Sequence, residues 1–339
     1  TMAMTIYDIS KKAGVSIATV SRVLNGSENV RPSTRKKVMD VIDKYDYTPN
    51  AFARGMGLHS LKTIGILCAD SSDLFLAKAV YFLEQELQAN GYESLLCCTG
   101  YNLDIKKNYL NLILSKKVDS IILVGSNFIG STEDENQYIK DVSTQVPIML
   151  LNASFDYPNV YSTLCDDYGT MFEATAEMIQ AGITDILYLY DSKSYSGLKK
   201  LHGFRDAMKE HNIPGFEKLI HFYDGNIEHL DEIADFVADI AKKGAPFHGI
   251  MTSDDSLAIG SIKYAQKKGI RIPEDLSVMG YNNSMLTNCC TPELTSVDNR
   301  LETQTHQLVQ TLLGVLAGEE MPKKSIFSGK IIKRGTTLF

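Results

Sequence analysis

The chain has 339 residues, of which 44% are hydrophobic and 22% are charged. This is the balance of a globular protein with more than one domain, and it excludes a disordered or fibrous chain. No run of about 18 apolar residues and no signal peptide is visible, so we expect no membrane span and a cytoplasmic location. The six cysteines form neither a disulfide framework nor a C-x-x-C site, which favours a reducing compartment.

The net charge of -7 conceals an asymmetry along the chain. Residues 1–62 hold ten Lys and Arg against five Asp and Glu, whereas acidic residues dominate the remainder. A basic N-terminal segment on an acidic body predicts an anionic partner at that end only.

The first 49 residues predict three short helices. Thr5 and Asp8 have the spacing of a capping box, and apolar residues follow at helical spacing. Gly14 ends this helix, Ser16 is suited to cap the next one, and Pro32 lies near the start of the third. A helix, a glycine turn and a second helix within about 20 residues are typical of a helix-turn-helix.

From residue 63 onward, apolar strand-like segments alternate with amphipathic helical ones. The expected strands include TIGILCA, SIILVG, PIMLLN, DILYLYD, HGIMTS and DLSVMGYN. This alternation indicates parallel sheets with helices on both faces, and its two cycles indicate two similar lobes. Residues 50–62 contain two glycines and lack a sizeable apolar face, so they predict a linker or a conditional helix.

The second predicted helix combines small hydroxyl side chains with one arginine. The hydroxyl residues are Ser16, Thr19 and Ser21. At a helix N-terminus such groups can donate hydrogen bonds to phosphate oxygens, while Arg22 can bind guanine in a major groove. Ile17 and Ala18 can contact thymine methyl groups. From composition alone, a small helical bundle with solvated serines remains an alternative.

Residues 14–27, GVSIATVSRVLNGS, resemble the headpiece signature of the lactose/galactose repressor (LacI/GalR) family. The resemblance covers the whole chain, through KTIGILCADSSDLF, KKVDSIIL, KLHGFRDAM, TSDDSLAIGSI and LSVMGYNNS. It implies an all-α helix-turn-helix headpiece (1–49), a hinge helix and linker (50–62), and a periplasmic-binding-protein-like core. The core would comprise two doubly wound parallel-sheet lobes, 63–162 with 298–322 and 163–297 with 323–339.

The resemblance also implies a geometry on DNA, in which a homodimer binds double-stranded operator with a two-fold pseudo-palindrome. Ile17, Ala18 and Arg22 occupy the base-reading positions. The positions that hold the DNA backbone are Thr5, Tyr7, Ser16, Thr19, Ser21, Asn25 and Asn29, with Tyr47 and Asn50 near phosphates. Met56, with Ala53 beside it, stands where the family places a leucine that wedges into the minor groove.

For the core, the resemblance implies a small effector between the lobes, in agreement with the rule that ligands bind at the carboxyl ends of parallel strands. The candidate effector residues are Asp70, Ser72, Phe75, Asn152, Tyr195, Lys200, Asp254 and Asn282, and Asp191 also follows a strand. Strand-end Asp and Asn side chains can instead cap the following helices. We favour that alternative for Asp73 and Asp255, and we favour the pocket for Asp254 and Asn282.

No Walker A lysine, G-x-G-x-x-G loop, G-x-S-x-G elbow or histidine metal cluster occurs, so we expect no cofactor, metal or catalytic residue. The hypothesis is a sequence-specific transcriptional regulator, a repressor of a sugar-utilisation operon controlled by a ligand between the lobes. Lys200 replaces the arginine common in the family, and the carboxylates leave room for a cationic or amino-bearing ligand. One alternative is a regulator gated by a phosphocarrier protein. An enzyme on the same scaffold is the other, and turnover of a bound sugar would identify it.

Overall fold

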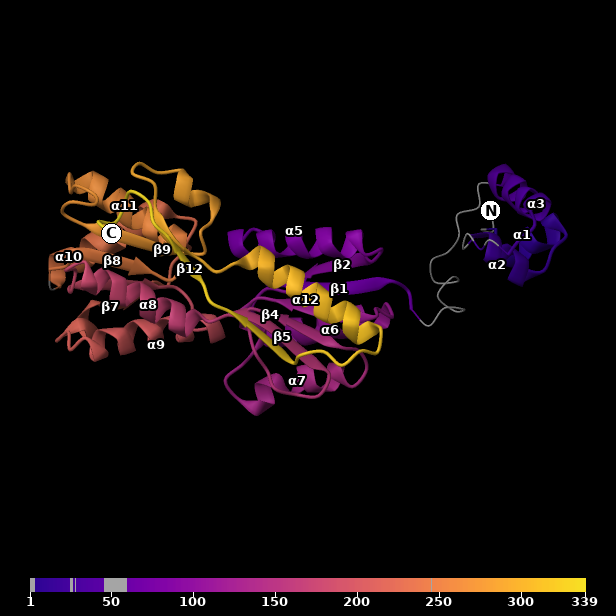
Figure 1. The fold of residues 1–339 in the computed structure, drawn as a ribbon, viewed down its shortest axis with the longest axis horizontal. Coiled ribbons are helices and arrows are strands. Elements are labelled where there is room, and N and C mark those ends of the chain that lie inside the picture. The colour runs from indigo at the N-terminus through magenta and orange to yellow at the C-terminus, as the bar shows by residue number, and fades with distance from the viewer. Residues whose placement is uncertain (1–3, 25–26, 28, 46–59, 245) are drawn as a thin grey trace. The chain divides into compact units, whose positions relative to one another are not determined.

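The computed structural model describes residues 4–24, 27, 29–45, 60–244 and 246–339. Internal packing divides the chain into two units, Thr1–Lys62 and Thr63–Phe339, which we call the head and the core. Figure 1 traces the helices and strands of both units in chain order.

The head contains the three predicted helices, α1 (Ile6–Ala13), α2 (Ile17–Leu24) and α3 (Pro32–Lys44). The capping box is present, since the Thr5 hydroxyl accepts from the amide of Asp8 and the Asp8 carboxylate accepts from the amide of Thr5. Gly14 ends α1 with a φ of 65°, a left-handed conformation that favours glycine. The apolar centre consists of Ile9, Val20, Val23, Val38 and Ile42.

Tyr45 lies at the end of α3, where helical spacing alone would place it on the buried face with Val38 and Ile42. Its side chain is 38% exposed, and the Lys12 ammonium lies 4.4 Å from the centroid of its ring. Tyr45 caps α3 and no longer shares the face of Val38 and Ile42. Periodicity alone therefore extended the buried face one residue too far.

The first lobe of the core is built on a parallel sheet with the strand order β11-β5-β4-β3-β1-β2. The strands are β1 (Thr63–Cys68), β2 (Glu93–Cys98), β3 (Ser120–Val124), β4 (Ile148–Leu151), β5 (Val160–Cys165) and β11 (Lys324–Phe327). Helices α5 (Leu74–Ala89) and α12 (Leu301–Leu316) pack side by side on one face, and α6 (Leu103–Ser115) and α7 (Glu133–Ser143) pack on the other (Figure 1).

The second lobe repeats this plan with the strand order β12-β10-β9-β8-β6-β7. Its strands are β6 (Ile186–Tyr190), β7 (Ile220–Phe222), β8 (Gly249–Thr252), β9 (Ser277–Tyr281), β10 (Thr295–Asp298) and β12 (Lys330–Ile332), of which β12 is antiparallel to β10. Helices α10 (Leu230–Lys243) and α11 (Asp255–Lys268) cover one face, and α8 (Asp167–Gln180) and α9 (Tyr195–Glu210) cover the other. Short 3₁₀ helices are η1 (Ser126–Phe128), η2 (Phe216–Leu219) and η3 (Met285–Asn288).

The lobe boundaries differ from those expected from the sequence. The first sheet includes β5, which crosses the expected boundary at residue 163, and β11, which we had assigned to the second lobe. Lys324 pairs with Ser162 and Phe327 with Cys165, so the chain re-enters the first sheet after α12 before it crosses to the second. A strand-like segment at the C-terminus does not itself reveal which of two sheets it joins.

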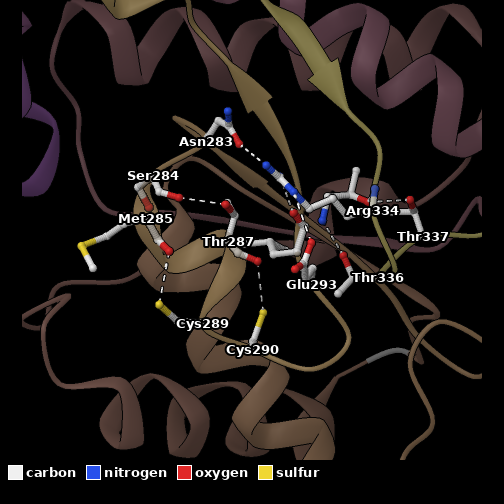
Figure 2. A network of polar contacts seen from close by, with 12 residues as sticks. Asn283, Ser284, Met285, Thr287, Cys289, Cys290, Glu293, Arg334, Thr336 and Thr337 are labelled. Atoms are coloured by element: carbon white, nitrogen blue, oxygen red, sulfur yellow. Dashed lines mark hydrogen bonds and ion pairs between the residues drawn. The ribbon is translucent and has the colours of Figure 1, made fainter.

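The C-terminal segment fixes a loop of the second lobe that follows β9. Arg334 donates hydrogen bonds of 2.8 Å to the side-chain oxygen of Asn283 and 2.9 Å to the carbonyl of Leu294. Thr336 accepts from the amide of Thr295, and Figure 2 shows this network joining the tail to the loop that carries Ser284 and Thr287. The loop begins at Asn282, which lies in the site described below, so the tail helps to hold that residue in place.

Candidate functional sites

The N-terminus of α2 carries two hydroxyl groups that interact with each other. The Ser16 hydroxyl accepts from the amide of Thr19 at 3.2 Å, as a helix cap does. The two side-chain oxygens of Ser16 and Thr19 are 2.9 Å apart. Ser16 is exposed and Thr19 is partly buried, so this pair forms a polar edge at the start of the helix.

One side of α2 is buried and the other faces solvent. Val20 and Val23 pack in the centre of the head, whereas Ile17, Ala18 and Arg22 are exposed. Ala18 and Arg22 are four residues apart and therefore share one face of the helix. This is the face that the sequence predicts to contact base edges, and its exposure agrees with that role.

The other predicted DNA contacts are only partly within the described residues. Thr5, Tyr7 and Asn29 are exposed, and Ser21 is partly buried. Five predicted contacts lie outside the described residues: Asn25, Tyr47, Asn50, Ala53 and Met56.

A cavity of 140 Å³ lies in the core and is lined by residues of both lobes. The first lobe contributes residues that follow β1, β2, β3 and β4, and the second contributes residues that follow β6, β7, β8 and β9. Five of the eight predicted effector residues line it, namely Phe75, Asn152, Lys200, Asp254 and Asn282. These residues converge because the carboxyl ends of parallel strands meet at one edge of each sheet.

Three predicted effector residues are not among those that line the cavity. Asp70 and Ser72 bond to each other, with the Ser72 amide and hydroxyl each 2.8 Å from the Asp70 carboxylate, and they line a neighbouring groove of 540 Å³. Tyr195 is the first residue of α9, and the cavity is lined instead by Ser196, Gly197 and Lys200 of that helix. Strand-end position alone did not indicate which face of α9 the cavity meets.

The cavity also contains residues that we did not predict for the effector site. They are Asp73, Leu76, Tyr101, Gly125, Ser126, Asn127, Asp191, Ser192, Ser194, Ser196, Gly197, Ile227 and Ser253. Most lie in loops, where the spacing of residues in the sequence does not indicate which way a side chain points. Asp191 was visible as a strand-end carboxylate.

Two carboxylates both cap a helix and line the cavity, although from the sequence we treated these two roles as alternatives. Asp73 caps α5 by accepting from the amide of Leu76 at 2.8 Å, as expected, and it also lines the cavity. Asp254 caps α11 by accepting from the amide of Ser256 at 2.7 Å, and it too lines the cavity.

Asp255 does not have the capping role that we favoured. It is the first residue of α11, is 1% exposed and accepts from the amide of Ser284 and the hydroxyl of Ser296, each at 2.6 Å. Burial, and then the charge of Asp254, raise the pKa of Asp255 to about 7. It therefore ties α11 to the loop after β9 from behind the cavity.

Lys200 occupies the second-lobe wall of the cavity and is 7% exposed. Its ammonium donates to the carbonyl of Ser253 at 3.0 Å and lies 3.9 Å from the centroid of the Tyr281 ring. The Tyr281 hydroxyl donates to Asp167 at 2.7 Å, and burial raises the pKa of this carboxyl. A buried network behind the cavity therefore fixes the position of the lysine.

Neutral donors hydrogen-bond to the carboxylates of the cavity. Asp191 accepts from the hydroxyl of Ser253 at 2.8 Å, and Asp254 accepts from the amide of Asn282 at 2.9 Å. Burial, and then the charge of Asp254, raise the pKa of Asp191. Burial, with the charges of Asp254 and Asp191, raises the pKa of Asp73 to about 6. The three carboxylates therefore repel one another across the cavity.

The described residues lack the features of a metal site and of a membrane-spanning helix. They contain no group of three or more His, Cys, Asp or Glu side chains placed to hold a metal ion. They also contain no helix with the length and apolar character to cross a bilayer.

Two family models match the chain. The one described as "Bacterial regulatory proteins, lacI family" matches residues 5–50, and the one described as "Periplasmic binding protein-like domain" matches residues 175–337. An HTH-type transcriptional regulator from Lachnoclostridium phytofermentans is 50% identical over 336 residues, which cover 99% of this chain and 100% of the relative. Catabolite control protein A from Priestia megaterium is 34% identical and covers 87% of each chain.

Solved structures share the fold at lower identity. The lac repressor dimer bound to operator and the anti-inducer ONPF matches with a TM-score of 0.87 at 20% identity, covering 99% of this chain and 100% of that one. The complex of the transcriptional regulator CelR with cellobiose matches with a TM-score of 0.70 at 22% identity, covering 98% of this chain and 99% of that one.

A helix-turn-helix head followed by a two-lobed binding-protein core defines a class of DNA-binding transcription regulators. The chain belongs to the lacI family of bacterial regulatory proteins. It is a transcriptional regulator and not an enzyme, in common with these relatives.

Proposed function

We propose that this regulator is a homodimeric repressor that works in the cytoplasm and binds a two-fold operator. In this account, a small hydroxylated ligand of sugar size binds between the lobes and controls the affinity for DNA. Each head places the exposed face of α2 in a major groove, with Arg22 contacting a base edge and the Ser16 hydroxyl near a phosphate.

The observation that carries the proposal is the composition of the cavity, which takes polar side chains from both lobes. Asn152 belongs to the first lobe, whereas Asp191 and Asn282 belong to the second. A ligand that bonds to both sets favours one arrangement of the lobes over another. Control by a ligand requires such a difference in binding free energy between two states.

The size of the cavity suits one small ring. Its volume of 140 Å³ is close to the roughly 150 Å³ of a cavity that holds benzene. Phe75 and Tyr101 supply aromatic surface in the lining, and serine hydroxyls supply donors and acceptors for hydroxyl groups. These features suit a monosaccharide ring.

The test is a panel of sugars, amino sugars and sugar phosphates added to the full-length protein. Thermal unfolding detects binding, because a ligand at a hundredfold excess over its Kd stabilises the folded state by about 2.7 kcal/mol. A stabilising sugar that also changes the affinity for DNA supports the proposal. No response to the panel, with a phosphocarrier protein raising the affinity for DNA, would favour the protein-gated alternative instead.

A further inference from the structure

The cavity has an excess of acidic side chains over basic ones. Asp73, Asp191 and Asp254 line it, and Lys200 is the one basic residue among the described residues of the lining. Three carboxylates against one ammonium leave the site negative when all are ionised. Asp70 extends this acidic surface into the neighbouring groove, which also includes Asp73, Asp191 and Asp254.

The lysine ammonium is also engaged by groups other than these carboxylates. Its ammonium bonds to the Ser253 carbonyl and lies over the Tyr281 ring, and its charge partly offsets the burial that raises the pKa of Asp167. Lys200 therefore shares its charge with Asp167 as well as with Asp191. The acidic side chains of the cavity keep an uncompensated charge.

Burial makes this excess of negative charge energetically unfavourable. The pKa of Asp73 rises to about 6 and that of Asp191 rises above its usual range, with burial as the first cause of each. A bound cation would offset both the burial and the mutual repulsion, because an opposite charge within a few ångströms favours the ionised carboxylate. A phosphorylated ligand would add to the repulsion.

An unpaired donor at the same cavity indicates that the ligand has acceptors too. The side-chain nitrogen of Asn127 is buried and has no hydrogen-bond partner, and Asn127 lines the cavity. A buried amide without a partner is unfavourable, and a hydroxyl or ring oxygen would satisfy it. The serine hydroxyls of the lining, Ser126, Ser192 and Ser194, offer further bonds to hydroxyl groups.

We propose that the effector is a protonated amino sugar, whose ammonium group binds among Asp73, Asp191 and Asp254 and whose hydroxyl groups bond to Asn127 and the serines. This inference rests on the proposed function of the cavity and specifies its ligand class. The ammonium group distinguishes this ligand from the parent neutral sugar and from its N-acetyl derivative, which has no charge.

The experiment measures Kd by calorimetry on the full-length protein for matched sets of probes. Each set consists of an amino sugar (glucosamine, galactosamine or mannosamine), the parent sugar and the N-acetylated sugar. We expect at least one amino sugar to bind about tenfold or more tightly than both neutral members of its set. Equal or weaker binding by all three amino sugars, including no binding, would overturn the proposal.

Two isosteric variants with the same change of charge locate the effect. Asp191→Asn removes a charge at the cavity, whereas Asp239→Asn removes one from an exposed side chain on α10 that pairs with Lys242 at 3.2 Å. We expect Asp191→Asn to reduce the preference for the amino sugar to below about threefold and Asp239→Asn to leave it intact. Equal effects of the two variants would indicate a general influence of net charge and would overturn the assignment.

The pH dependence gives a second readout. Because the pKa of Asp73 is about 6, the preference for the amino sugar should fall as pH decreases through that value and the carboxylate takes up a proton. A preference that stays constant would contradict the role of Asp73.

The result separates this inference from the proposed function. A neutral sugar that binds and changes the affinity for DNA, while the amino sugars do not bind, would preserve the function and reject the ligand class. An amino sugar that binds with the expected preference but leaves the affinity for DNA unchanged would support the ligand class and reject the proposed control of DNA binding.

Discussion

The hydroxyl of Ser126 in the first lobe donates a 2.8 Å hydrogen bond to the hydroxyl of Ser194 in the second lobe. Ser126 begins η1 after β3, and Ser194 caps α9 by accepting from the amide of Gly197 at 3.3 Å. Both residues line the cavity, so the bond joins the lobes at the place where a ligand would bind. It stabilises this arrangement of the lobes over one in which they separate.

We predict that Ser126→Ala weakens ligand binding while leaving the cap of α9 in place. A lost hydrogen bond of this kind costs about 1 kcal/mol, which corresponds to about a fivefold rise in Kd if the ligand requires this arrangement. Calorimetry with any ligand that stabilises the protein checks this result. Ser115→Ala is the control, because that exposed hydroxyl bonds to the carbonyl of Leu112 within α6. The same Kd for the ligand in both variants would show that the bond between Ser126 and Ser194 does not stabilise the arrangement of the lobes that binds the ligand.

Asp255 should make the stability of the core depend on pH. Its pKa is raised from an ordinary value near 3.8 to about 7, so the folded state binds more protons than the unfolded state between these values. Stability from this group is therefore present at low pH and is lost as pH rises towards 7. Between pH 5 and pH 8, the unfolding free energy of the wild-type protein should therefore fall. We expect this fall to be smaller by about 2 kcal/mol in Asp255→Asn.

Urea denaturation at the two pH values measures this change. Asp275→Asn is a suitable control, because Asp275 is an exposed carboxylate whose pKa is lowered by its hydrogen bond to Arg271. If the wild-type protein and Asp255→Asn lose equal stability between the two values, Asp255 does not titrate in this range.

Gly203 should tolerate no larger residue, because α8 and α9 approach closely there. A Cβ at this position would lie 2.3 Å from the carbonyl oxygen of Tyr168. Gly203→Ala must therefore move α9, which carries Lys200 and Ser196 to the cavity. We expect a loss of about 1–3 kcal/mol in the unfolding free energy, whereas Lys199→Ala on the exposed face should cost much less. Denaturation that shows no difference between the two variants would contradict this packing.

Arg22 should determine sequence preference more than overall affinity. Its exposed position on α2, one turn after Ala18, favours a contact with a base edge. We predict that Arg22→Ala costs about 1–3 kcal/mol on the preferred duplex and relaxes the preference at one base position per half-site. Selection from random duplexes measures both effects. Lys37→Ala, at an exposed position on α3, is the control. A uniform loss on all duplexes would identify Arg22 as a phosphate contact.

The sequence allowed much of the fold to be predicted, because the relevant signals are local. The capping box at Thr5, the glycine turn at Gly14 and the alternation of strands and helices all appear as expected. Helix α7 was not predicted, since its sequence EDENQYIKDVS is polar along much of its length. The membership of β11 in the first sheet was also missed, because pairing between distant segments leaves no local pattern.

The site was predictable where a residue directly follows a strand. Asn152 and Asn282 meet this condition, Asp254 comes two residues after β8, and all three line the cavity. Tyr101 lies in a loop and Asn127 in the short helix η1, and because the course of both segments depends on the packed structure, no spacing rule could locate these residues. Whether the predicted DNA and effector residues contact their ligands stays a prediction, which the variants above test.

The most direct test of the account measures how a ligand and DNA affect each other on the full-length protein. The DNA is a duplex selected by the protein from random sequences, and the ligand is one that stabilises the protein in the sugar panel. We predict that the ligand changes the Kd for the duplex by about 5- to 150-fold, and that the duplex changes the Kd for the ligand by the same factor. A ligand that binds while the Kd for the duplex stays unchanged would contradict control through the cavity.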